Sequence, residues 1–222
     1  MSGSKEYFDA IGAGWDRMQQ SFFSERIRER AFAIAGVQAG RLAADLGAGT
    51  GFVTGGLLER GLRVIAVDQS PAMLATLRAK FPDADCRGGD AAALPIDDDR
   101  VAYCFANMFL HHVDDPPRAI GEMARVTAPG GRIVVTDLDL HQHEFLRVEH
   151  HDRWMGFARA DVERWFRAAG LTEVHIACLD ERCCACSEAG EQAAIGIFAA
   201  SGTKPARAVP PIAGVNRVGD PC

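Results

Sequence analysis

The 222-residue sequence has no run of about 18 apolar residues and no run of Lys and Arg. Lys and Arg total 24 against 30 Asp and Glu, which gives a formal net charge of −6 at pH 7. A chain without a basic patch is a poor partner for the phosphate backbone of nucleic acid. A chain without a long apolar run offers no membrane-spanning helix. We therefore expect neither nucleic acid as a partner nor membrane insertion.

Two further patterns are missing. The N-terminal residues lack the apolar core of a secretory signal, so we expect a cytoplasmic protein. The cysteines lack the paired C-x2-C spacing of a structural zinc site, and in a reducing compartment we expect them to be thiols. They are Cys86, Cys104, Cys178, Cys183, Cys184, Cys186 and Cys222.

Length and composition favour a single domain with a substantial core, because 48% of the residues are hydrophobic. We expect this domain over residues 1–203. Residues 1–36 are predicted to form an N-terminal helical cap, which either packs on the sheet or acts as a lid over a ligand. Residues 204–222 are rich in Pro and small residues and are predicted to be a flexible tail.

A glycine-rich turn is the strongest positive signal. Residues 43–51 read Ala-Ala-Asp-Leu-Gly-Ala-Gly-Thr-Gly and lie between two apolar stretches. This pattern predicts strand, tight turn and helix, in which glycines adopt positive φ and let a ligand approach the N–H groups that begin the helix. The spacing is G-x-G-x-G, whereas a dinucleotide site uses G-x-G-x-x-G. An ordinary strand-to-helix turn is the alternative.

The turn resembles motif I of class I S-adenosylmethionine-dependent methyltransferases, in which an acidic residue, here Asp45, precedes the glycines. Further features follow in the order of that family, since later predicted strands end at Asp68, Asp90 and Asn107. The resemblance covers residues 5–203 and is closest to the quinone-biosynthesis and arsenite methyltransferases. It implies an α/β fold with a doubly wound, Rossmann-like seven-stranded sheet, an antiparallel last strand and helices on both faces.

The resemblance also implies S-adenosyl-L-methionine as the cofactor. Asp68 would accept hydrogen bonds from both ribose hydroxyls, Asp90 would meet the adenine amino group, and the backbone N–H of Ala91 would donate to the ring. A solvated strand end and a plain turn are the alternatives for the two aspartates. The expected cofactor-binding residues are Asp45, Gly47, Ala48, Gly49, Gly51, Asp68, Gln69, Asp90, Ala91 and Asn107.

The acceptor side is expected near His111 and His112, which follow the stretch that faces the methionine moiety in this family. Imidazoles titrate near neutrality, so both are candidate catalytic bases, with a pocket-wall role as the alternative. Tyr7, Trp15 and Trp154 are expected to line the substrate pocket together with His111. We expect in-line methyl transfer to a small-molecule acceptor. The alternative is a sensor or accessory protein that binds S-adenosylmethionine or S-adenosylhomocysteine without turnover.

Histidine and aspartate are frequent between residues 137 and 152, where His141-x-His143 and His150-His151 could supply nitrogen ligands to a metal. This spacing matches no specific metal motif, so the sequence predicts no metal site.

Cys183, Cys184 and Cys186 fall between two expected strands, 172–179 and 193–200. Three thiols could bind trivalent arsenic, which makes arsenite methylation a minor alternative function. Arsenite methyltransferases, however, carry a cysteine directly after the asparagine that follows strand four, and this chain has Met108 there. We therefore expect an exposed thiol loop and no arsenite methylation.

Overall fold

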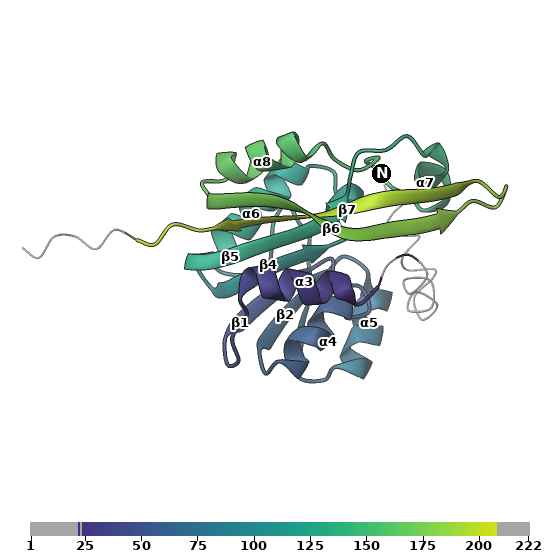
Figure 1. The fold of residues 1–222 in the computed structure, drawn as a ribbon. Coiled ribbons are helices and arrows are strands. Elements are labelled where there is room, and N and C mark those ends of the chain that lie inside the picture. Colours follow the sequence, from purple (N-terminus) through teal and green to yellow (C-terminus); the bar gives the residue numbers. More distant parts are fainter. Residues whose placement is uncertain (1–21, 23, 208–222) are drawn as a thin grey trace, which may run out of the picture.

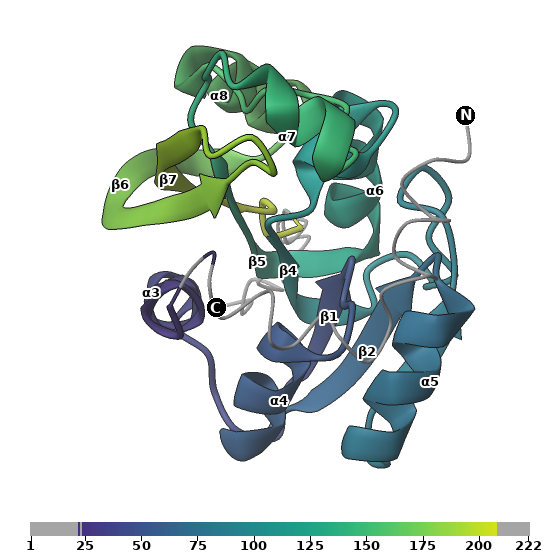
Figure 2. The same cartoon turned by 90° about the vertical axis from the view of Figure 1, so that its right-hand side faces the viewer.

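The computed structural model describes residue 22 and residues 24–207. A seven-stranded sheet lies between two layers of helices (Figures 1 and 2). The strands are β1 (Leu42–Leu46), β2 (Arg63–Asp68), β3 (Asp85–Gly88), β4 (Val101–Asn107), β5 (Thr127–Leu138), β6 (Thr172–Cys186) and β7 (Gln192–Thr203). The helices are α3 (Arg26–Ala35), α4 (Phe52–Glu59), α5 (Pro71–Lys80), α6 (Pro116–Val126), α7 (Glu144–Glu149) and α8 (Arg159–Ala168), with a 3-10 turn, η2, at Leu110–His112.

The strand order is β3-β2-β1-β4-β5-β7-β6. Strands β1 to β5 are parallel, whereas β7 is antiparallel to both of its neighbours. The doubly wound sheet and its antiparallel last strand confirm the fold expected from the sequence. After β3 the chain crosses back to β4 on the other side of β1, and ligands bind at such a switch point, beyond the carboxyl ends of the strands.

Apolar side chains cover both faces of the sheet. On one face, Phe32 of α3 meets Phe105 of β4 edge-on, with the ring centroids 5.5 Å apart. On the other face, Met123 of α6 and Phe166 of α8 belong to the largest buried cluster, and neither is exposed to solvent. Two buried faces explain why the central strands are continuous apolar runs without alternation. Among the described residues, no helix has the length and apolarity needed to cross a membrane.

The described part of the expected N-terminal cap is helix α3, which packs against α4, β5, β6 and β7. Ile27, on the inner side of this helix, is fully buried. The described helix therefore packs on the sheet, and the lid alternative for the residues that precede it stays a prediction. Tyr7 and Trp15, which the sequence places in the substrate pocket, lie outside the described residues.

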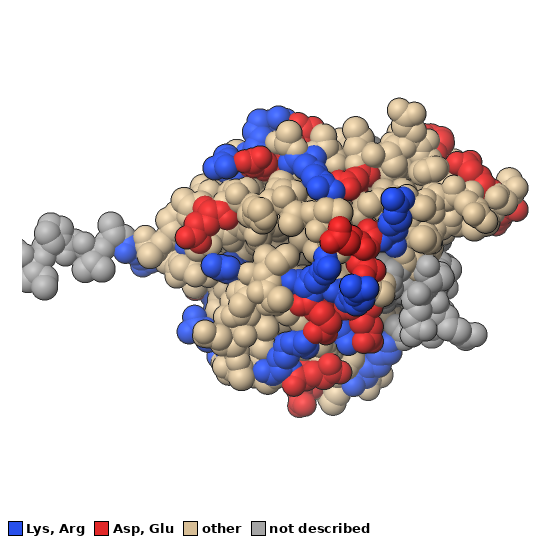
Figure 3. All heavy atoms as spheres, in the orientation of Figure 1, with Lys and Arg blue, Asp and Glu red and all other residues tan. Residues whose placement is uncertain are grey.

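The surface over α3 and α4 carries acidic and basic side chains side by side, with no continuous basic patch on that face (Figure 3). Arg26 pairs with Glu181, and Arg60 pairs with Glu29. That nucleic acid is not a partner stays a prediction from the net charge.

The closing hairpin is longer than the sequence indicates. Strands expected at 172–179 and 193–200 extend to Cys186 and from Gln192, so only residues 187–191 connect them. The prediction that Cys183, Cys184 and Cys186 lie in a loop is therefore wrong. Buried contacts extend the strands: Cys183 and its partner Ile195 pack in one cluster with Leu138.

The first residues of the expected tail are held by ion pairs. The Lys204 ammonium donates to Asp99 at 2.6 Å, and the Arg207 guanidinium pairs with the same carboxylate. The segment that follows strand β7 is thus held by ion pairs as far as residue 207. The remainder of the tail lies outside the described residues.

Candidate functional site

A cavity of about 430 Å³ lies beyond the carboxyl ends of β1, β2 and β4. Its size is in the range of small-molecule and cofactor sites. Nine of the ten residues that the sequence predicts to bind the cofactor line it: Asp45, Gly47, Ala48, Gly49, Asp68, Gln69, Asp90, Ala91 and Asn107. The tenth, Gly51, is the N-cap of helix α4 and does not line the cavity.

The glycine turn that forms one wall requires glycine at its alternate positions. Gly47, Gly49 and Gly51 have φ of 63°, 52° and 97°, in the left-handed region that other residues rarely occupy. A Cβ atom on Gly47 would lie 2.1 Å from Cδ2 of Phe109. The turn and the Phe109 ring therefore pack so closely that a side chain at Gly47 would enter the ring.

Asp45 fastens the turn to the helix that follows it. Its Oδ2 accepts hydrogen bonds from the backbone N–H of Thr54 at 2.9 Å and from the Thr54 hydroxyl at 2.6 Å. Burial raises the pKa of Asp45 to about 7, although the Thr54 hydrogen bonds oppose the shift, and the Asp68 charge adds to it. The acid that the sequence assigns to the cofactor thus also has a structural role.

This pKa predicts how stability depends on pH. Because the folded pKa of Asp45 lies above the unfolded value of 3.8, the native state holds the proton between about pH 4 and pH 7. The stabilising contribution is complete below about pH 4 and is lost progressively as the pH rises from about 4 to about 7. Asp45→Asn should remove this component, whose slope is at most about 1.4 kcal/mol per pH unit. Urea unfolding at several pH values measures it, and parallel curves for the two proteins would contradict the assignment.

Asp68 ends β2 at the floor of the cavity. Its Oδ2 accepts a hydrogen bond from the Gly49 N–H and its Oδ1 accepts one from the Ser70 N–H, both at 2.8 Å. A carboxylate can accept about four hydrogen bonds. The carboxylate is therefore held in place between the glycine turn and the start of α5.

Asp90 and Asn107 are also held by contacts within the chain. Asp90 Oδ1 accepts from the Ala92 N–H at 2.8 Å and closes a short turn. Asn107 Oδ1 accepts from the Thr136 hydroxyl at 2.6 Å on the adjacent strand. The next residue, Met108, has φ of 49°, which is uncommon for a residue other than glycine and is typical of functional sites.

The two histidines differ in position. His112 lines the cavity, whereas His111 is buried behind it and its Nδ1 lies 2.7 Å from Asp137 Oδ1. Trp154, like His111, does not line the described cavity: its side chain is 41% exposed and its indole N–H donates to the Val113 carbonyl at 2.9 Å. The neighbouring Arg153 lines the cavity in its place.

The ionisable side chains behind the cavity wall strongly affect one another's pKa values. Burial lowers the pKa of His111, but the carboxylates of Asp137 and Asp152 outweigh it and raise that pKa to about 9. Burial and the His111 charge together hold the pKa of His112 well below its usual value. Burial raises the pKa of Asp152 to about 6, against the opposing effect of His111. The wall imidazole of His112 is therefore neutral near pH 7.

Several wall residues were missed by sequence reasoning. Some directly follow predicted positions and could have been found by extending the motifs. Arg118 and Arg153 carried no sequence signal, because only the fold brings them together. The missed residues are Phe52, Val53, Ser70, Met73, Ala92, Asp114, Asp115, Arg118 and Arg153, whereas Met108, Phe109 and Val113 belong to the stretch that the resemblance places at the methionine moiety.

The three clustered thiols do not converge on one point. Successive side chains of a strand point to opposite faces, so Cys183 is buried while Cys184 and Cys186 are exposed. Burial raises the pKa of Cys183 to about 12, which keeps it a thiol. Cys104 is also buried, as the sequence predicts for a core residue.

Replacing Cys183, Cys184 and Cys186 together by serine is expected to change cofactor affinity less than about twofold, since none of the three lines the cavity. Calorimetric titration with S-adenosylhomocysteine measures this. The wild type should also form no methylated arsenic from arsenite and a thiol. Methylated arsenic that is lost in the triple variant would contradict the expectation.

Comparison with known proteins agrees with the geometry. The model of a family described as a methyltransferase domain matches residues 44–135, from β1 into β5. An uncharacterized methyltransferase of Mycobacterium tuberculosis is 50% identical over 130 residues, which are 59% of this chain and 51% of that protein. A demethylmenaquinone methyltransferase of Renibacterium salmoninarum is 36% identical over 114 residues, covering 51% of this chain and 48% of the relative. The chain thus spans about half the length of these curated relatives.

A solved structure shares the fold. Phosphoethanolamine N-methyltransferase 2 of Haemonchus contortus, in complex with phosphomonomethylethanolamine and S-adenosylhomocysteine, superposes with a TM-score of 0.66 at 16% identity, covering 80% of this chain and 52% of that one. The chain is thus similar in sequence and in fold to class I methyltransferases. The demethylmenaquinone methyltransferase is in line with the resemblance to the quinone-biosynthesis group that the sequence indicates.

Proposed function

We propose that this protein transfers a methyl group from S-adenosylmethionine to a small-molecule acceptor. One observation carries the proposal: nine residues from four separate segments, each expected on a cofactor-binding motif, line a single cavity at the switch point of the sheet. Ligands of open α/β sheets bind at this place. Each of the four segments brings polar or glycine residues of an expected motif to this edge, which an ordinary strand-to-helix turn alone does not explain.

The residues present fit the cofactor. Asp68 is fixed by the N–H groups of Gly49 and Ser70, so its carboxylate is in place to accept ribose hydroxyls. The absence of a side chain at Gly47 leaves room for the Phe109 ring, which lines the same cavity. Asp90 and Ala91 line the same cavity, where we assign them to the adenine ring.

The chain's own contribution to catalysis is alignment and exclusion of water. S-adenosylmethionine, when bound, supplies a methyl group already activated by the positive charge on sulfur. Met108, Phe109 and Val113 provide apolar wall next to Asn107, and His112 adds a neutral imidazole there. The base role predicted for His111 and His112 stays a prediction, and the position of His112 on the wall favours it over His111.

The acceptor is proposed to be a small molecule with polar groups. Asp114, Asp115, Arg118 and Arg153 line one part of the cavity and offer charges of both signs. The net charge of −6 supports an acceptor other than nucleic acid. The cytoplasmic location and the domain limits at 203 and 204 also stay predictions.

A turnover assay tests the proposal. The purified chain is incubated with S-adenosylmethionine and a panel of small quinols, phenols, amines and carboxylates, and S-adenosylhomocysteine is measured by mass spectrometry. We expect product with at least one class of acceptor and none from Asp68→Ala at the same cofactor concentration. Tight cofactor binding without product across the panel would support the sensor alternative instead. The named relatives are methyltransferases, which favours turnover.

A further inference from the structure

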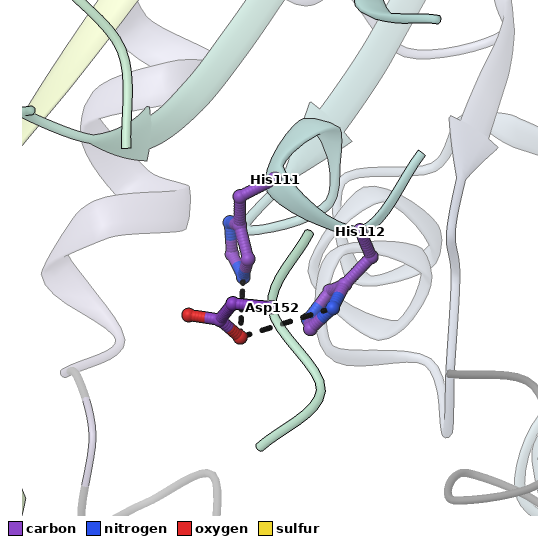
Figure 4. A group of neighbouring side chains, drawn as sticks. All are labelled: His111, His112 and Asp152. Carbon is purple, nitrogen blue, oxygen red and sulfur yellow. Dashed lines mark ion pairs between the residues drawn. The ribbon is translucent and has the colours of Figure 1, made fainter. Parts of the chain in front are cut away.

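We propose that His111, His112 and Asp152 bind a divalent transition-metal ion behind the cavity wall. Each offers one ligand atom, and these atoms all lie within 4.8 Å of one another. Asp152 Oδ1 is 3.8 Å from His111 Nε2 and 3.9 Å from His112 Nδ1. Figure 4 shows both imidazole rings directed at the same carboxylate oxygen.

A fourth residue orients the cluster. Asp137 is fully buried, and its Oδ1 lies 2.7 Å from His111 Nδ1, which directs Nε2 of that ring toward Asp152. A histidine that binds a metal almost always donates its second ring N–H to a carboxylate or carbonyl in this way. In the neutral form of His111, the pairing keeps the ring proton on Nδ1 and leaves Nε2 as the atom that can bind a metal.

The backbone holds the ligands in place although Asp152 lies 40 residues after His112 in the sequence. Both histidines belong to the short turn η2, and the His111 carbonyl accepts hydrogen bonds from the N–H groups of Arg153 and Trp154 at 2.9 and 3.1 Å. Ligand atoms around a zinc ion with bonds of about 2.0–2.1 Å lie roughly 3.3 Å apart. Side-chain shifts of less than about 1 Å would therefore close the site around an ion.

The donor set indicates the kind of ion. Two imidazoles and one carboxylate suit zinc and iron(II) and their first-row neighbours better than calcium or magnesium, which prefer oxygen ligands. Three protein ligands leave at least one coordination position open, as in catalytic rather than structural zinc sites. The proposed site adjoins the cavity through His112, which lines it.

This inference departs from the sequence prediction of no metal, which considered the spacings at 141–143 and 150–151. If methyl transfer occurs as proposed, the ion would hold an oxygen of the acceptor and lower its pKa. The histidines would then act as ligands rather than as free bases. Ion binding itself does not depend on methyl transfer, so it is tested separately.

The test uses the full chain with Cys184→Ser and Cys186→Ser, which removes two exposed thiols that could bind metal. The protein is stripped with a chelator and titrated with Zn²⁺ by calorimetry and with Co²⁺ by absorption. We expect one ion per chain and a Co²⁺ spectrum without a sulfur charge-transfer band. His112→Gln and Asp152→Asn should each weaken Zn²⁺ binding at least about tenfold, and Asp137→Asn roughly 10- to 100-fold. His175→Gln, on an exposed histidine of β6, is the control and should bind like the parent.

Zn²⁺ binding unchanged in His112→Gln and Asp152→Asn, with native circular dichroism, would overturn the proposal. So would a parent protein that binds no ion. X-ray absorption of the Zn²⁺-loaded parent needs no variant: two imidazoles with oxygen neighbours are expected, and sulfur or fewer than two imidazoles would contradict the site. Ion binding without turnover would overturn only the proposed function, and turnover without ion binding only this inference.

Discussion

Replacing Asp68 by alanine is expected to weaken the binding of S-adenosylmethionine by about 2 to 4 kcal/mol, or roughly 30- to 700-fold. Hydrogen bonds to a charged carboxylate contribute about 1.5 to 3 kcal/mol each, and water compensates for part of that loss. The variant also removes the acceptor for the Gly49 and Ser70 N–H groups, so the glycine turn loses a support at the same time. Isothermal titration calorimetry measures the affinity.

Two further variants test whether the loss of affinity comes from the Asp68 carboxylate itself. Asp97→Ala removes an exposed aspartate that does not line the cavity, and it should bind like the wild type. Asp68→Asn keeps the size of the side chain but loses its charge and one acceptor oxygen, so its affinity should fall between those of Asp68→Ala and the wild type. Wild-type affinity in Asp68→Ala would remove this residue from the site.

Replacing Gly47 by alanine is expected to lower the free energy of unfolding by about 2 to 5 kcal/mol. A positive φ costs a residue with a Cβ about 1 to 2 kcal/mol, and overpacking adds about 1 to 3 kcal/mol. The new Cβ would lie 2.1 Å from the Phe109 ring, which must move and reshape the cavity wall. Cofactor affinity should therefore fall together with stability. Urea unfolding measures the first effect and calorimetry the second.

Gly36→Ala is the matched control, because Gly36 has nearly the same φ of 62° but no atom within 4 Å of a Cβ placed there. Gly36→Ala should lower the free energy of unfolding only by the cost of a positive φ, about 1 to 2 kcal/mol. It should leave the cofactor affinity unchanged. Equal losses of stability in the two variants would show that the contact between Gly47 and Phe109 has no energetic importance.

The sequence was sufficient to predict the doubly wound sheet and the residues expected to bind the cofactor. Buried parallel strands are continuous apolar runs, and polar or glycine residues at their ends, such as Asp68 and Asn107, mark where each strand stops. The carboxyl ends of parallel strands meet at one edge, so the order of these residues along the chain was enough to place them together.

The acceptor half could not be predicted in the same way, because it depends on contacts between distant segments. His111 and Asp152 approach each other only because the residues after Asp152 bond to the His111 carbonyl. The Trp154 indole bonds to the Val113 carbonyl, and the adjacent Arg153 lines the cavity in its place. No local pattern around residue 154 records which of the two neighbours faces inward.

The ends of the strands in the closing hairpin were predicted wrongly for another reason. Charged residues at 180–182 interrupt the apolar run, so the sequence indicated the end of a strand there. The ladder instead shifts its register between Cys178 and Arg182 and resumes, because Cys183 and Ala185 can be buried opposite Ile195 and Ala193. A bulge of this kind leaves little local signal.

The crystal structure of the protein with bound S-adenosylhomocysteine tests the central claim most directly. We predict the ligand in the 430 Å³ cavity, with both ribose hydroxyls within hydrogen-bond distance of the Asp68 carboxylate and the adenine beside Asp90 and Ala91. The amino-acid end should lie between the glycine turn and Asn107. A ligand bound elsewhere, or one in this cavity whose ribose does not contact Asp68, would contradict the account.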